Sequence, residues 1–123
     1  MLSKDAVVKV RKALEAEYIG TFTVTEHQKV TKPNHTTSFE DVDVLYDQPC
    51  RLSFSSSPAA TDGNVAEVNQ TVKLFCSPDI TVKEGSKIVV TQNGVTTEYK
   101  QSGTPALYET HQEIILELFR GWA

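Results

Sequence analysis

The strongest constraint on the fold is a tight turn at Asn93-Gly94, between two runs that are rich in β-branched residues. Both residues tolerate positive φ, which a two-residue type I′ turn requires, so the pair predicts a β-hairpin over residues 86–99. Because a lone hairpin is only marginally stable in water, other strands must cover its apolar face. The turn also fixes the register, and the expected pairs are Gln92–Val95, Thr91–Thr96, Val90–Thr97, Val89–Glu98 and Ile88–Tyr99.

The two faces of this hairpin differ in polarity. The face expected in the core carries Ile88, Val90, Val95 and Tyr99. This alternation predicts a sheet with one buried face and says nothing of function. The face expected in water carries Lys87, Thr91, Thr96, Glu98 and Lys100.

The length and charge of the chain bound its class. At 123 residues, we expect a single domain over residues 1–123 with a core of its own. The formal net charge of −4 argues against a dedicated nucleic-acid-binding protein, although it allows passive contact with DNA. No apolar run approaches a membrane span, so no membrane contact is expected. The first residues lack the pattern of a signal peptide, so we expect the protein to stay in the cell that makes it.

The two cysteines are far apart in the sequence and lack the C-x-x-C spacing of redox and metal sites. In a reducing compartment, Cys50 and Cys76 are expected to be buried free thiols, which pack as small hydrophobic side chains. A disulfide or a redox pair is the alternative.

The N-terminal residues predict one amphipathic helix over residues 4–18. Ser3 is the expected N-cap, Asp5 lies in the first turn, and Gly20 is the expected stop. We expect this helix to cover one end of the β core; an exposed docking helix is the alternative.

Alternating polarity predicts further strands over residues 21–30, 39–46 and 68–77, and another around Cys50. A polar turn is expected at residues 32–37, and Asp47-Gln48-Pro49 is expected to break the chain between two strands. Together with the hairpin, these segments predict a mainly β fold: a small single-domain β-barrel of about six to seven antiparallel strands, with one N-terminal α-helix and a long flexible loop. The side chains expected to face inward are Phe22, Val24, Val42, Val44, Cys50, Leu52 and Phe54.

A long polar segment interrupts this pattern at residues 55–67. It is made of small residues, contains no aromatic side chain, and is long for a connection in a domain of this size. Such loops are either functional or simply mobile. Its members are Ser55, Ser56, Ser57, Pro58, Ala59, Ala60, Thr61, Asp62, Gly63, Asn64, Val65, Ala66 and Glu67.

The C-terminal segment fits two structures. Residues 111–119 form an alternating strand with Ile114, Leu116 and Leu118 inward, whereas residues 107–122 also fit a helical stripe. We favour the strand, because a barrel needs a closing partner and Ile-Ile favours β-structure. The strand leaves an apolar cluster on the outer face, which predicts a subunit interface unless the N-terminal helix covers it. The predicted interface residues are Ile115, Phe119 and Trp122.

No catalytic or metal-binding constellation is recognisable. His27, His35 and His111 have no partner at metal-ligand spacing, so each is expected to be a surface or turn residue, and no cofactor is expected. The acidic run at residues 40–43 alternates with valines and fits the solvent face of a strand. Ser55-Ser56-Ser57 has no recognisable base near it. The sequence therefore favours a non-enzymatic protein.

Four segments resemble a known family: DQPCRLSFSSSPA, SPDI, EGSKIVVTQNG and YETHQEI, at residues 47–59, 77–80, 84–94 and 108–114. They are similar to the head-closure, or stopper, proteins of the head–tail connector in long-tailed phages and prophages of low-GC Gram-positive bacteria. The resemblance spans nearly the whole chain and is strongest from residue 48 onward.

The resemblance implies a structural role. Such proteins are small β-barrels that assemble as a homo-oligomeric ring below the portal and adaptor after DNA packaging, and the other side of the ring receives the tail. It implies a location in the virion neck after assembly in the bacterial host cytoplasm. A long loop from each subunit obstructs the channel, and residues 55–67 are the counterpart here. This loop has no Lys or Arg, so its non-specific contact with passing double-stranded DNA would be steric or made by the backbone.

Other functions stay open at this stage. A tail-completion or adaptor protein of the same neck is one alternative, although adaptors tend to be mostly helical. A small β-barrel module that binds a peptide or an oligonucleotide is another. An isolated monomer is compatible with the ring, because such rings often need the portal–adaptor platform as a template.

Overall fold

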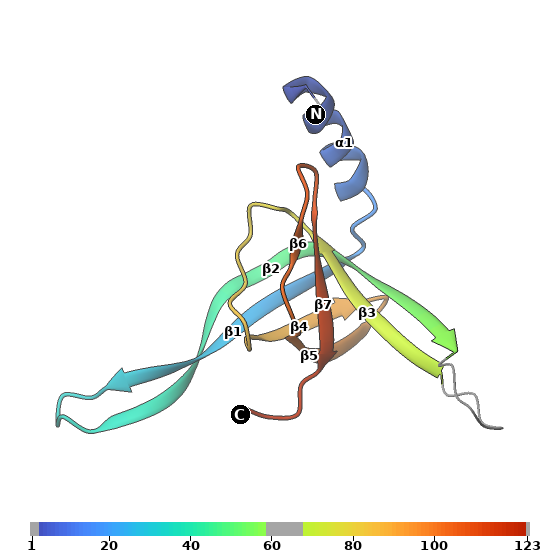
Figure 1. The fold of residues 1–123 in the computed structure, drawn as a ribbon. Helices are drawn as coiled ribbons and strands as arrows, with labels where there is room; N and C mark the ends of the chain where they lie inside the picture. The colour runs from blue at the N-terminus through green and yellow to red at the C-terminus, as the bar shows by residue number, and fades with distance from the viewer. Residues whose placement is uncertain (1–2, 59–67, 123) are drawn as a thin grey trace.

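The computed structural model describes residues 3–58 and 68–122 (Figure 1). One helix is followed by strands only, so the mainly β class predicted from the sequence is confirmed. The elements are α1 (Lys4–Glu15), β1 (Gly20–Thr31), β2 (Thr37–Pro58), β3 (Val68–Cys76), β4 (Lys87–Gln92), β5 (Val95–Gln101), β6 (Ala106–Leu107) and β7 (Gln112–Leu118).

The strands form one antiparallel sheet that closes on itself. The hydrogen-bonded order is β3-β2-β1-β4-β5-β7-β6, and an additional pairing of β3 with β7 closes the sheet. The short β6 pairs only with residues 112 and 113 of β7. Such closure is one way in which small antiparallel folds protect their strand edges.

The Asn93-Gly94 turn has the predicted geometry. Asn93 and Gly94 have φ values of 53° and 76°, and all five predicted pairs of the β4–β5 hairpin are present. The hydroxyl oxygens of Thr91 and Thr96 lie 2.8 Å apart across the strands. The prediction that Val95 is buried is wrong: its side chain is 63% exposed, because it follows the turn directly and lies beyond the core.

The second strand runs through the predicted break at residues 47–49. β2 is one strand of 22 residues, so the two strands expected on either side of Asp47-Gln48-Pro49 are a single element. Asp47 has a φ of 44°, and the β1–β2 register shifts on both sides of Val24. These irregularities are β-bulges, which bend a strand without ending it. The prediction that Val44 faces the core is wrong: its side chain is 38% exposed, because the register shift beside it places Leu45 against the core instead. Because β2 bends, it pairs with β1 along residues 37–50 and with β3 along residues 51–58.

Two hairpin arms project from the closed sheet (Figure 1). β4 pairs with β1 only as far as Thr25, so residues 26–31 and their partners in β2 continue as a first arm. β7 pairs with β3 only from Val72 onward, so residues 55–58 and 68–71 continue as a second arm. The polar turn predicted at residues 32–37 is the tip of the first arm, where the Lys32 amide donates to the Thr36 carbonyl at 2.8 Å.

The core is apolar and includes both thiols. Cys50 and Cys76 are fully buried and free, as predicted. The buried Gln112 is a polar member: its amide nitrogen donates to the carbonyl oxygens of Ser77 and Ile80, at 2.9 and 2.6 Å. The apolar members are Phe22, Val24, Leu52, Leu74, Val82, Ile88, Val90, Tyr99, Ile114 and Leu116.

The helix is shorter than predicted and does not cover the core. The Ser3 hydroxyl accepts a hydrogen bond from the Ala6 amide at 3.1 Å, which confirms the N-cap, but α1 ends at Glu15, and Gly20 belongs to β1. None of the helical residues is buried, and Figure 1 shows α1 standing away from the sheet. The expectation that the helix covers one end of the sheet is therefore wrong, and the exposed helix is the arrangement observed.

The C-terminal segment is a strand, as predicted. Ile114 and Leu116 of β7 are buried between β3 and β5. Leu118, which the alternation also placed inward, is 54% exposed, so its predicted burial is wrong.

Gly20 stands where β1 begins beside β4. A Cβ atom there would lie 2.9 Å from the Thr91 carbonyl oxygen and 3.2 Å from the Gln92 Cβ. Gln92 itself holds β2, because its side-chain oxygen accepts from the Leu52 amide at 2.8 Å. An added methyl group would therefore push β4 away from both strands.

We expect Gly20→Ala to lower the free energy of unfolding by about 1–3 kcal/mol, the usual range for overpacking. Urea denaturation followed by circular dichroism measures the change. The exposed neighbour Thr21 supplies the control, since Thr21→Val should alter stability by less than about 0.5 kcal/mol. Equal stability of Gly20→Ala and the parent protein would contradict the close approach of the strands.

Candidate functional site

The second arm contains part of the loop predicted to obstruct the channel. Residues 55–58 are not loop: they extend β2 and pair with residues 68–71 of β3, with Pro58 opposite Val68. The prediction that the loop begins at Ser55 is therefore wrong by four residues. Residues 59–67, the rest of the predicted loop, lie outside the described residues.

The predicted interface residues separate into two locations. Phe119 and Trp122 pack edge to face, with ring centroids 5.0 Å apart, and Trp122 stacks on His27 at 4.9 Å. His27 stacks in turn on Phe39, so the first arm covers Trp122, and the N-terminal helix does not. Ile115 lies elsewhere, opposite Lys73 in the β3–β7 pair, and is 43% exposed. Of the three predicted residues, Ile115 keeps the outward position expected of an interface side chain.

The histidines have more partners than the sequence suggested. His27 lies between two aromatic rings, and its Nδ1 is 3.0 Å from an Asp41 oxygen. His111 Nε2 is 2.9 Å from a Glu113 oxygen, and this hydrogen bond lowers the pKa of Glu113. His35 has a φ of 64° in the turn of the first arm, as a turn residue would. Within residues 3–58 and 68–122, no three His, Cys, Asp or Glu side chains gather as metal ligands.

The two thiols are not reactive groups. Burial raises the pKa of the Cys50 thiol to about 12, with a smaller contribution from the nearby Cys76. Burial also raises the pKa of Cys76 to about 12, against a hydrogen bond with Gln112 that lowers it. Because the thiolate is the nucleophile, thiols with such pKa values are inert at neutral pH.

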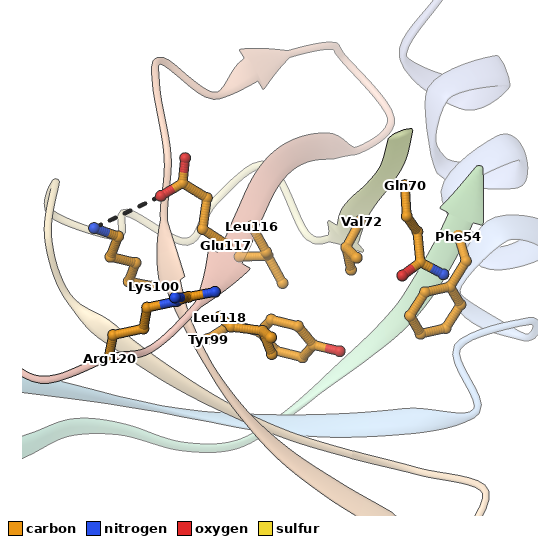
Figure 2. A pocket seen from close by; sticks show the side chains of 9 residues that line it. All are labelled: Phe54, Gln70, Val72, Tyr99, Lys100, Leu116, Glu117, Leu118 and Arg120. Atoms are coloured by element: carbon orange, nitrogen blue, oxygen red, sulfur yellow. Dashed lines mark ion pairs between the residues drawn. The ribbon is translucent and has the colours of Figure 1, made fainter. Parts of the chain in front are cut away.

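An open pocket lies at the end of the closed sheet, beside the base of the second arm (Figure 2). We call it the mouth. Its volume is about 490 Å³, and Figure 2 shows the Tyr99 ring pointing across it toward Phe54. Its lining residues come from β2, β3, β5 and β7 and the segment after β7: Phe54, Gln70, Val72, Tyr99, Lys100, Leu116, Glu117, Leu118 and Arg120.

The mouth exists because β7 is too short to fill the space between β3 and β5. β7 pairs with β3 only up to Leu116 and with β5 only up to Leu118. Phe54 and Leu118 face this space, and they are 53% and 54% exposed. Val95 lines an adjoining pocket of about 220 Å³ together with Phe54. The sequence predicted that Phe54, Val95 and Leu118 face inward. They do, but no neighbouring strand among the described residues covers them.

The rim of the mouth carries positive charge. Lys100 Nζ lies 3.6 Å from a Glu117 carboxylate oxygen, and the Ser102 hydroxyl donates to the same side chain at 3.0 Å. Arg120 forms no ion pair with any of the described residues. An apolar floor beside a guanidinium suits an apolar or aromatic side chain with an acidic neighbour.

Comparisons with known proteins add little to this geometry. A scan against protein-family models finds no match, and a search of curated proteins finds none. Among solved structures, the chain is similar to the phage-like element PBSX protein xkdH from Bacillus subtilis, at 10% sequence identity and a TM-score of 0.47. The match covers 80% of this chain and 90% of that chain. A likeness of this degree carries no argument about function. No helix within the described ranges is long and apolar enough to cross a membrane.

The buried thiols predict loss of stability at alkaline pH. The unfolded chain releases these protons near pH 8.5, whereas the folded chain holds them to about pH 12. Between these values the unfolded state binds fewer protons, so the free energy of unfolding falls as the pH rises, by at most about 1.4 kcal/mol per pH unit for each thiol. Urea denaturation from pH 7 to pH 10.5 measures the slope.

The control is the Cys50→Ala/Cys76→Ala variant, which should be less stable at pH 7 but should have a shallower alkaline slope. Equal slopes, or rapid labelling of the native thiols by a disulfide reagent at pH 8, would show that the thiols are accessible.

The aromatic stack predicts that Trp122 contributes to the stability of the isolated chain. We expect Trp122→Ala to lower the free energy of unfolding by about 1–2 kcal/mol, since it removes two aromatic contacts. Ile115→Thr keeps a β-branched side chain on the outer face and should cost less than about 1 kcal/mol. Thermal unfolding of both variants compares them, and equal losses would mean that Trp122 does not pack against the first arm.

Proposed function

We propose that this chain is a non-catalytic structural subunit of a phage neck ring, which closes the DNA-filled capsid below the portal and adaptor and provides the surface to which the tail attaches. The observation that carries the proposal is the second arm, a strand-paired extension in which residues 55–58 pair with residues 68–71 beyond the closed sheet (Figure 1). The similarity of four sequence segments to head-closure proteins supports the same role.

The arm suits a plug in a ring. Backbone pairing of residues 55–58 with residues 68–71 fixes the direction in which the arm leaves the closed sheet. Residues 59–67 contain only small or polar side chains and Val65. Several copies of such a segment can crowd around one axis, where bulky side chains would clash. The proposed role of the arm is to bring these copies together in the channel.

The charge of the arm suits the passage of DNA. Over residues 55–71, Asp62 and Glu67 are the only charged residues, and there is no Lys or Arg. A basic lumen would bind phosphates and slow the passage of the duplex, because protein cations displace the counterions of DNA. The plug would therefore retain DNA by steric obstruction, and it could move aside when DNA leaves without breaking ion pairs to phosphates.

The exposed helix offers a surface to a neighbouring ring. Val8 and Val10 of α1 are 55% and 39% exposed. Arg11 connects the helix to the turn after β3, where it donates to Ser77 and Asp79 at 3.0 and 2.9 Å. We assign α1 and Ile115 to contacts with the portal–adaptor ring or with tail proteins. Only one helix is present among the described residues, which favours head closure over an adaptor role.

Deletion of the gene from the phage or prophage that encodes it tests the proposal. We expect particles without tails that have lost their DNA, and a copy of the gene supplied in trans should restore infectious particles. Filled heads without tails would favour a tail-completion role. Infectious particles in the absence of the gene would refute a role in the neck.

Shortening of the plug tests the arm alone. Deletion of residues 60–64 should change the free energy of unfolding by well under about 1 kcal/mol, because closure entropy depends only logarithmically on loop length. Particles built with this variant should assemble and then lose DNA, measured as the ratio of empty to filled heads in electron micrographs. Replacement of the same residues by a Gly-Ser segment of equal length is the control and should retain DNA. A large drop in the melting temperature would mean that the loop belongs to the packed core.

A further inference from the structure

The mouth has the properties of a receptor for a second protein surface. Its floor is formed by Phe54, Val72, Tyr99 and Leu118, and no described residue of the chain fills it. The exposure of Phe54 and Leu118, each about half, is unfavourable in water and is relieved when another apolar group occupies the space. Arg120 on the rim forms no ion pair with the described residues, and its charge favours an occupant that brings a carboxylate.

A surface with the complementary chemistry lies on β2. Residues 43–47, Asp43-Val44-Leu45-Tyr46-Asp47, place exposed apolar side chains between two carboxylates, and we call this segment the acidic knob. Tyr46 is 62% exposed and Val44 is 38% exposed. The Asp47 side chain forms no hydrogen bond or ion pair with the described residues; its backbone amide donates to the Thr23 hydroxyl at 3.3 Å.

The knob is free on one side of its strand. β1 pairs with one edge of residues 43–47, and β3 pairs with β2 only from Arg51 onward. The two bulges and the φ of 44° at Asp47 distort the free edge, which discourages the addition of another strand there. The knob can therefore contact a partner through its side chains, with Tyr46 as the most exposed of them.

We propose that copies of this chain bind head to tail, with Tyr46 of one copy in the mouth of the next and Asp47 facing Arg120. The inference rests on the proposed ring and names the contact that joins its subunits. The knob and Phe54 of the mouth are held at separate positions along β2, so one chain cannot fill its own mouth with its own knob. A repeated contact between unlike surfaces is heterologous, and it generates a ring when the rotation closes.

The contact is small. One aromatic side chain and one ion pair bury less than the roughly 1,200–2,000 Å² of a stable interface, so free subunits should associate weakly. Chemical cross-linking is therefore the suitable measurement. Since Cys50 and Cys76 are buried, only added thiols react at neutral pH. Two exposed positions beside the contact accept cysteine without altering Tyr46 or Arg120: Val44, a member of the knob two residues before Tyr46, and Gln70 on the rim of the mouth.

The experiment mixes full-length Val44→Cys protein with Gln70→Cys protein and adds a short bismaleimide. We expect a heterodimer as the main cross-linked product, and a ladder of multimers from one chain that carries both substitutions. The matched control is Lys9→Cys, on the exposed face of α1, mixed with Gln70→Cys. Its yield measures random collisions.

Charge reversal identifies the pairing. Arg120→Glu in the Gln70→Cys chain should lower the heterodimer yield about fivefold, the effect of one exposed ion pair. Asp47→Arg in the Val44→Cys chain should restore it. Tyr46→Ser should lower the yield, and Tyr46→Phe should retain it. The melting temperatures of Arg120→Glu, Tyr46→Ser and Tyr46→Phe should match that of the parent protein, because these side chains are exposed. Asp47→Arg should lower the melting temperature slightly, because the φ of 44° at this position suits Asp better than Arg.

Three outcomes would overturn the inference: a heterodimer yield no greater than that of the Lys9→Cys control, a loss in Arg120→Glu that Asp47→Arg does not rescue, or homodimers of Val44→Cys as the main product. The last would indicate a two-fold contact.

The contact and the proposed function can fail separately. If phage that carries Arg120→Glu still retains its DNA, the proposed contact is refuted and the role in the neck stands. If the cross-links are specific but the gene is dispensable, the contact stands and the role in the neck is refuted.

Discussion

The structure depends on β2 remaining a single hydrogen-bonded strand while it changes partners. Along its first half it pairs with β1, and along its second half it pairs with β3. The bulges near Val44 and Asp47 bend the strand between these halves. Without the bend, β3 could not reach β7, and the pairing of β3 with β7 is what closes the sheet around the core.

The same arrangement creates the features that we connect with function. β2 is longer than the closed sheet that it helps to form, so it extends beyond the sheet at both ends. Each extension pairs with one neighbour only, and these pairs are the two arms. The short β7 leaves the mouth open beside the second arm. A rigid scaffold, a projecting arm and an unfilled apolar pocket are the parts expected of a subunit that works in an assembly, and the fold alone would not imply them.

Packing inside the chain also changes how the C-terminus is interpreted. The sequence grouped Ile115, Phe119 and Trp122 as one exposed cluster, because all three are apolar and near one another in the chain. In the structure the stack of Trp122 on His27 joins residues that are far apart in the sequence. Histidine has an apolar ring with polar edges, so the pattern of hydrophobic residues gave no signal that His27 would cover a tryptophan. The mouth escaped sequence analysis for a related reason: Phe54, Val95 and Leu118 look like ordinary core residues of three separate strands.

The sequence by itself determined what depends on neighbours along the chain. The Asn93-Gly94 turn imposed its dihedral angles and hence the register of β4 and β5, Ser3 capped the helix, and alternation assigned the inward side of Phe22, Val24 and Ile114. Only the tertiary structure decided where each strand ends relative to its partners. That relation determined whether an inward side chain such as Phe54 is covered, whether β2 bends or breaks at Asp47, and whether α1 has a surface to pack on. These outcomes depend on the free energy of pairing between segments that are distant in the sequence, and a local sequence pattern does not reveal that free energy.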